Sequence, residues 1–99
     1  MTFEQHVRAA LDSLPPELAR KLENVAVVVE DENVEDPDLL GLFEELPYMP
    51  ARIAIYRIPL EEEFPDPAAL EREIRITVLH ELAHYFGIDE DRLDELGYS

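Results

Sequence analysis

The pattern His80-Glu81-x-x-His84 constrains this chain more than any other feature of its sequence. Residues four apart share one face of an α-helix, so His80 and His84 can present two imidazoles to one metal ion. Glu81 projects from nearly the same side, and its carboxylate can take a proton from a water that the metal activates. The spacing therefore predicts a helix that carries a metal-dependent hydrolytic site of the kind found in metallopeptidases.

The residues after this pattern strengthen the prediction. Gly87 can adopt the left-handed conformation that ends a helix and turns the chain back. The acidic residues Asp89, Glu90 and Asp91 follow at once, so the turn could return a third ligand to the metal. The simplest alternative is a metal-free structural domain, in which the pattern arose by chance on a solvated helix.

Length and composition limit the other possibilities. The chain has 99 residues and no cysteine, which predicts one domain over residues 1–99, an open surface cleft rather than an enclosed pocket, and no thiol chemistry. No apolar run is long enough to cross a membrane and no secretory leader is evident, so we expect no membrane partner and a cytoplasmic location.

The net charge of −16 argues against a nucleic-acid partner, because phosphates would be repelled from most of the surface. The charge is compatible with basic peptide substrates, although solubility alone would explain it.

The periodicity of apolar residues predicts an alternation of helices and strands. Thr2 and Gln5 form a capping box for a helix through Leu14, on which His6 falls outside the apolar stripe and is expected to face solvent. Pro16 can open a short helix to about Leu22. The remaining expected elements are a strand buried on both faces at 25–29, a loop at 30–38, a helical turn or edge strand at 39–46, a strand at 52–58 and a solvated loop at 61–63.

The helix that carries the histidines has clear boundaries. Asp66-Pro67 supplies an N-cap followed by proline in the first turn, and the helix is expected to end near Phe86. Its apolar stripe is separate from the face that bears Thr77 and the three motif residues, whereas a core histidine would lie on the stripe. Asp89 can cap a last short helix from Glu90 to Leu96. The stripe consists of Leu70, Ile74, Val78 and Leu82.

The sequence from His80 to Glu90, together with Glu95-Leu-Gly-Tyr98, resembles a small bacterial family of zincin-like metallopeptidases, once known only as a domain of unknown function. The segments 39–44 and 52–57 also resemble this family. The resemblance implies an α+β fold: a minimal zincin-like domain with a small mixed β-sheet, a backing helix and an active-site helix carrying the motif. It implies zinc as the cofactor. Larger zincins have a Met-turn beneath the metal. We expect none here, and Tyr98 is expected to support the site instead or to lie in the core.

The chain departs from the family pattern at one position. The family has aspartate three residues beyond the glycine, where this chain has Glu90, with Asp89 beside it. Either carboxylate is an ordinary zinc ligand, and we favour Glu90 because of its position. Alternatively, these acids only stabilise the positive end of the last helix.

These observations predict a zinc-dependent peptidase. His80, His84 and Glu90 would bind zinc, and Glu81 would act as the general base. A peptide or protein substrate would pair with a sheet edge, either along 40–44 or along 53–56. The alternative is a zincin-like interaction or regulatory module that keeps the metal site but turns over weakly or not at all. The sequence leaves the oligomeric state open, a homodimer included.

Overall fold

Three strands form a mixed sheet in the order β1-β3-β2 in a computed structural model of the chain, which describes residues 2–87 and 89–95. The strands are β1 (Ala26–Glu30), β2 (Gly41–Leu46) and β3 (Met49–Tyr56). The helices are α1 (Phe3–Asp12), α2 (Pro16–Lys21), the 3₁₀ turn η1 (Leu22–Asn24), α3 (Arg57–Glu63), α4 (Pro67–Phe86) and α5 (Glu90–Glu95). This α+β arrangement confirms the fold class expected of a minimal zincin-like domain.

Strand β3 is central and is paired on both sides. It runs parallel to β1, with Val28 opposite Ala54, and antiparallel to β2, with Phe43 opposite Ile53. The predicted strand at 25–29 is present as β1. The prediction that it is buried on both faces is wrong, because β1 is an edge strand whose side chains are partly buried or exposed. The fully buried positions lie instead on β3, where Ile53, Ala54 and Ile55 are each 0% exposed.

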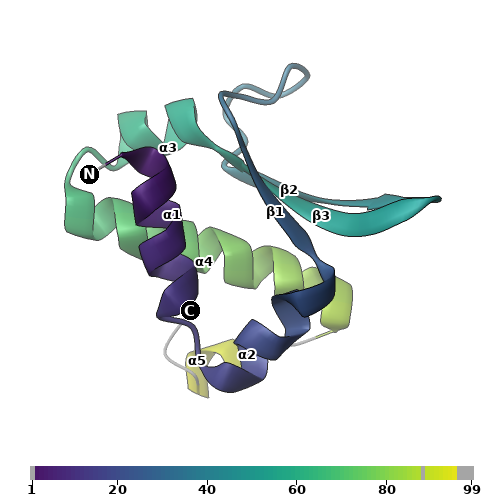
Figure 1. Cartoon of the computed structure of the whole chain (residues 1–99). Coiled ribbons are helices and arrows are strands. Elements are labelled where there is room, and N and C mark those ends of the chain that lie inside the picture. The colour runs from purple at the N-terminus through teal and green to yellow at the C-terminus, as the bar shows by residue number, and fades with distance from the viewer. Residues whose placement is uncertain (1, 88, 96–99) are drawn as a thin grey trace.

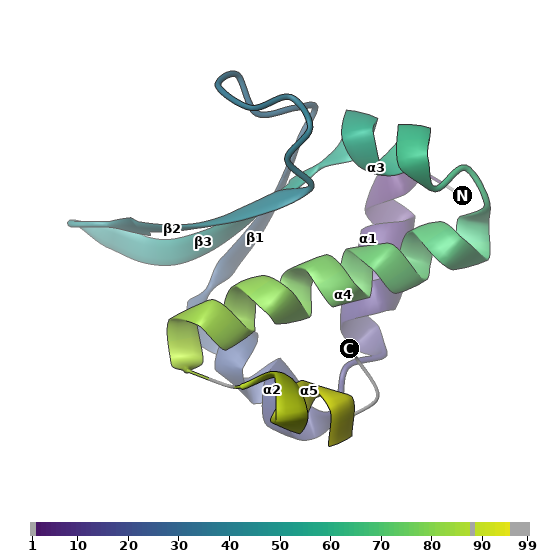
Figure 2. The ribbon, with the colours of Figure 1, turned by 180° about the vertical axis from the view of Figure 1, so that it is seen from behind.

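Helices α1 and α4 pack on the same side of the sheet (Figures 1 and 2). Between them and the strands lies the hydrophobic core, to which α1 contributes Phe3 and Val7 and α4 contributes its apolar stripe. The β2–β3 hairpin extends beyond the helices at one end of the molecule, and the 31–40 loop stands at the other end of β2 (Figure 1). Helix α4 therefore runs beside the sheet with one face turned toward the core and another left open.

Local capping signals define the helices as expected. Both hydrogen bonds of the Thr2–Gln5 capping box are present, and Pro16 is the first residue of α2. At the start of α4, Asp66 Oδ2 accepts a hydrogen bond from Ala69 N at 3.0 Å. Gly87 ends α4 in the left-handed conformation with φ +67°. None of the described helices has both the length and the apolar character needed to cross a bilayer.

The segment 57–63 is helical, so the expected strand end at Ile58 and the expected loop at 61–63 are both wrong. Arg57 begins α3 and pairs with Glu61 one turn later at 2.6 Å and with Asp31 at 3.0 Å. Leu60 is 0% exposed, which anchors the helix in the core. The ion pair between Arg57 and Glu61 and the burial of Leu60 explain why residues 61–63 form the last turn of a helix rather than a loop.

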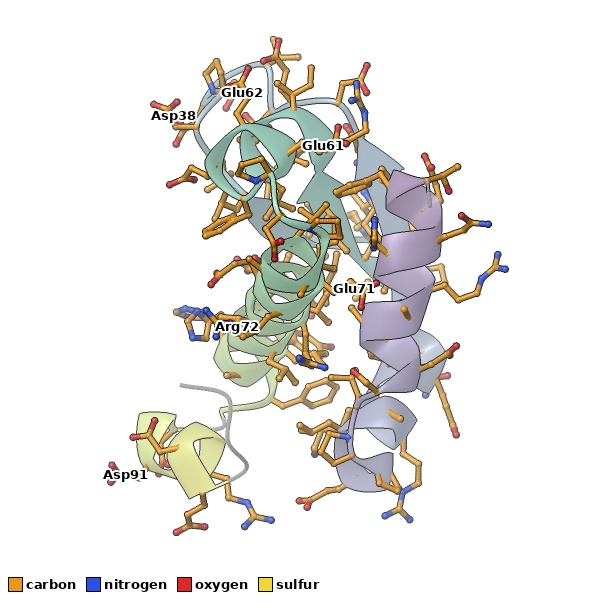
Figure 3. All side chains as sticks on the ribbon, turned by 90° about the vertical axis from the view of Figure 1, so that its left-hand side faces the viewer. Asp38, Glu61, Glu62, Glu71, Arg72 and Asp91 are labelled. Atoms are coloured by element: carbon orange, nitrogen blue, oxygen red, sulfur yellow. The ribbon has the colours of Figure 1, made fainter. Side chains whose placement is uncertain are left out.

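His6 is buried, contrary to the expectation that it faces solvent. Its Nδ1 lies 2.7 Å from Glu71 Oε1, and Glu71 sits between α4 and α1 (Figure 3). The pair links the two helices where they cross. The helical wheel of α1 alone could not reveal it, because the partner lies 65 residues away.

Candidate active site

Helix α4 presents both motif histidines at the surface. The stripe beneath them is buried as expected, with Leu70 at 6% exposure and Ile74, Val78 and Leu82 at 0%. His80 and His84 are exposed, and no hydrogen bond joins either imidazole to another residue in the described part of the chain. Two imidazoles one turn apart, with ring nitrogens not used elsewhere, suit the donor preference of zinc.

Glu81 is half-buried between these histidines and strand β2. Its loss of hydration on burial raises the pKa of the Glu81 carboxyl above the ordinary glutamate range. A hydrogen bond from the backbone of Phe43 lowers this pKa, and so, to a smaller extent, do the charges of His84 and His80. The effect of burial is larger, so the pKa of Glu81 remains raised. A carboxyl with a raised pKa beside two imidazoles suits proton transfer.

The outer edge of β2 adjoins this carboxyl. Tyr56 N donates to Leu40 O at 3.0 Å, and in an antiparallel ladder the hydrogen-bonded positions alternate. Gly41 and Phe43, which face Ile55 and Ile53, are therefore non-hydrogen-bonded positions. Their N–H and C=O groups point away from β3, toward the free edge. The contact between Phe43 and Glu81 is on that edge.

A shallow cleft of about 340 Å³ includes two of the three motif residues. We name it the histidine cleft. The 31–40 loop forms one wall, and Asn33 holds that loop in place: its Nδ2 donates to Tyr56 Oη at 3.0 Å, and its Oδ1 accepts from Glu35 N and Asp36 N at 2.9 Å each. The cleft is lined by Asp36, Asp38, Leu39, Leu40, Gly41, Thr77, His80 and Glu81.

A second cleft of about 390 Å³ lies at the other end of β2. We name it the tyrosine cleft. Tyr85 directly follows His84, stacks on Phe43 with ring centroids 4.3 Å apart, and shares a hydrogen bond with Glu45 that raises the pKa of the Tyr85 phenol. The cleft is lined by Glu45, Leu46, Pro47, Met49, Ala51 and Tyr85. This cleft was not predicted from the sequence, although the aromatic residue next to a motif histidine was a usable signal.

Of the three predicted zinc ligands, the structure describes the side chains of His80 and His84. Within residues 2–87 and 89–95, no cluster of three or more His, Asp or Glu side chains is placed to hold a metal. Asp89 Oδ1 accepts from Arg92 N at 2.8 Å, so Asp89 is the N-cap of α5, as expected. The side chain of Glu90 and all of Tyr98 lie outside the described residues. The donor set thus consists of two available imidazoles, with Glu90 as the predicted third member.

One protein family matches most of the chain. The family model described as zincin-like metallopeptidase matches residues 22–98, which include the sheet, α3, α4 and the whole motif. None of the curated proteins compared with the chain matches it. The match covers most of the sequence, and the chain belongs to the zincin-like metallopeptidase family.

Proposed function

We propose that this protein is a zinc-dependent peptidase. His80 and His84 would hold the metal, with Glu90 as the third protein ligand. When bound, zinc would supply a Lewis acid that makes water more acidic and polarises the scissile carbonyl. Zinc is the metal that the family implies, and the free imidazoles of α4 fit it.

The position of Glu81 carries the proposal. Its carboxylate lies beside two imidazoles on one flank and the free strand edge on the other, so it can reach a water held between them. As general base it would accept the water's proton and then deliver that proton to the leaving amine. Partial burial favours the protonated carboxyl, which supports the second of these steps. Tyr98 stays a proposed supporting residue.

Strand β2 is the better candidate for substrate pairing. Strand β3 has partners on both sides, so the stretch 53–56 has no free backbone groups to offer. The Gly41 and Phe43 backbone groups point outward, and this edge adjoins Glu81 and His80 in the histidine cleft. An extended peptide added to this edge would bring its carbonyl groups past the motif residues.

A second function has some structural support. Both clefts are open and shallow, which leaves little wall to exclude water or grip a substrate. A module that binds zinc and a peptide strand without turnover is consistent with this exposure.

Cleavage of a diverse peptide library, analysed by mass spectrometry, separates the two functions. The zinc-loaded protein should generate new peptide termini, a chelator should stop their formation, and added zinc should restore it. The His84→Ala variant, prepared in parallel, controls for a contaminating protease. An inert wild-type protein that nevertheless contains stoichiometric zinc would favour the module.

A further inference from the structure

We infer that the tyrosine cleft is a side-chain subsite that accepts a lysine or arginine of an extended peptide bound along β2. This inference rests on the proposed function for its biological meaning, but the binding site it describes can be measured without catalysis. The family description names no substrate, and the inferred subsite would select peptides that contain lysine or arginine.

The location of the cleft is the first argument. Glu45 and Leu46 are the last residues of β2, and Tyr85 follows His84 on α4, so the cleft adjoins both the strand edge and the motif helix. Phe43 connects the two, because its backbone contacts Glu81 while its ring stacks on Tyr85. A peptide strand that passes Phe43 would therefore continue toward this cleft. Alternate side chains of such a strand point to the same face.

The chemistry of the lining is the second argument. Leu46, Pro47, Met49 and Ala51 are apolar residues, and Glu45 contributes a carboxylate to the same cleft. Among the residues that the structure describes, no lysine or arginine lines it. Lysine and arginine combine a long aliphatic stem with a cationic head, so the stem can cover the apolar wall while the head reaches the carboxylate. An acidic side chain would meet Glu45 instead, and a short apolar one would leave that carboxylate without a counter-charge.

The aromatic residues are the third argument. Tyr85 is 44% exposed, with Phe43 stacked on its ring and Phe86 at its edge. The same aromatic group already holds one cation of this chain, since Lys21 Nζ lies 4.9 Å from the centre of the Phe86 ring. A cation held near Tyr85 would gain both a ring contact and the charge of Glu45.

General attraction is the explanation that must be separated from this one. With a net charge of −16, any cationic peptide is drawn to the protein. Acidic side chains project at opposite ends of the molecule, with Asp38, Glu61 and Glu62 at one end and Asp91 at the other (Figure 3). The test therefore needs a control variant with the same loss of charge at a distant position. Glu62 is suitable because it is exposed on α3, which follows Tyr56 at the end of β3 opposite Met49 and Ala51 of the tyrosine cleft.

Peptide binding to the zinc-free protein, followed by two-dimensional NMR, tests the subsite. Two extended seven-residue peptides would be compared that differ only at the middle position, lysine in one and norleucine in the other, so that stem length is kept and charge is removed. The lysine peptide should bind roughly five- to tenfold more tightly, the size expected of an exposed ion pair and an exposed cation–π contact combined. It should shift the backbone signals of residues 45–51.

Four variants locate the effect. Glu45→Gln should reduce the preference for lysine to about twofold or less, because the ion pair is lost. Glu62→Gln should leave the preference unchanged. Tyr85→Phe keeps the ring and frees Glu45 from the phenol, so the preference should persist, whereas Tyr85→Ala should reduce it. Equal affinity of the two wild-type peptides, or a preference that survives in Glu45→Gln, would overturn the subsite.

The outcome is distinguishable from failure of the proposed function. Lysine-selective binding at residues 45–51 in a zinc-loaded protein that cleaves nothing would retain the subsite and reject the peptidase. Cleavage of peptides without regard to lysine, and without signal changes at 45–51, would retain the peptidase and reject the subsite.

Discussion

Thr77 of α4 lies so close to Gly41 of β2 that a Cβ atom at position 41 would be 2.5 Å from Thr77 Cγ2 and 3.2 Å from the Ala54 carbonyl oxygen. Glycine is required here by the neighbouring helix and strand rather than by an unusual backbone angle. The absence of a side chain lets the edge strand approach α4 one turn before His80. We expect this close approach to set the distance between the free strand edge and Glu81.

Gly41→Ala should therefore destabilise the fold by about 1–3 kcal/mol, the usual range for an overpacked core position. The double variant Gly41→Ala/Thr77→Ser should recover part of this loss, because serine lacks the offending methyl group. Urea unfolding of the wild type and of both single and double variants gives the coupling between the two positions. Additive effects, without recovery in the double variant, would show that the contact does not set the strand position.

Glu81→Gln should stabilise the metal-free protein at neutral pH. Burial raises the pKa of Glu81, so the folded state binds this proton more tightly than the unfolded chain does. The protonated Glu81 contributes its whole stabilisation at pH values below the pKa of glutamate in the unfolded chain. This stabilisation is lost as the pH rises through the higher pKa of Glu81 in the folded state. Because glutamine does not ionise, the variant should be more stable than the wild type at pH 7. The two proteins should have similar stability at about pH 3.5, below the ordinary glutamate pKa.

Urea unfolding at the two pH values measures this difference. A variant that is less stable than the wild type at neutral pH would mean that the hydrogen bond from Phe43 outweighs the desolvation of the carboxylate.

Asp89 and Glu90 should respond differently to replacement by alanine. Asp89→Ala removes the N-cap bond to Arg92 N and should cost about 1 kcal/mol of stability while leaving zinc affinity unchanged. Glu90→Ala should weaken zinc binding, because it removes the proposed third ligand. Calorimetric titration of zinc into both metal-free variants checks this assignment. A large loss of affinity in Asp89→Ala, with none in Glu90→Ala, would transfer the ligand role to Asp89.

Features that depend on a few neighbouring residues were predictable from the sequence. The Thr2–Gln5 box, the Asp66-Pro67 start, the Gly87 end and the Asp89 cap all satisfy backbone groups within three or four residues, and each is present. The separation of the α4 stripe from the motif histidines follows from helical geometry in the same way. Gly41 could not be interpreted from the sequence, since its partner Thr77 is distant in the chain.

The errors arose where tertiary contacts outweighed local pattern. The apolar run 25–29 reads as a buried strand, yet strand order makes it an edge, and pairing order is not encoded in a single strand. His6 is buried because α4 supplies Glu71, and residues 61–63 are helical because Leu60 enters the core. For the candidate site, sequence alone offered two possible substrate edges, and the central position of β3 leaves β2 as the edge beside the motif.

The most direct test of the account compares peptide hydrolysis by the wild type and Glu81→Gln at equal zinc content. The amide keeps the shape of the side chain but cannot accept a proton, so the variant should retain one zinc per chain and lose hydrolysis by roughly two to four orders of magnitude, the usual contribution of a general base. Equal rates of hydrolysis in the two zinc-loaded proteins would contradict the account.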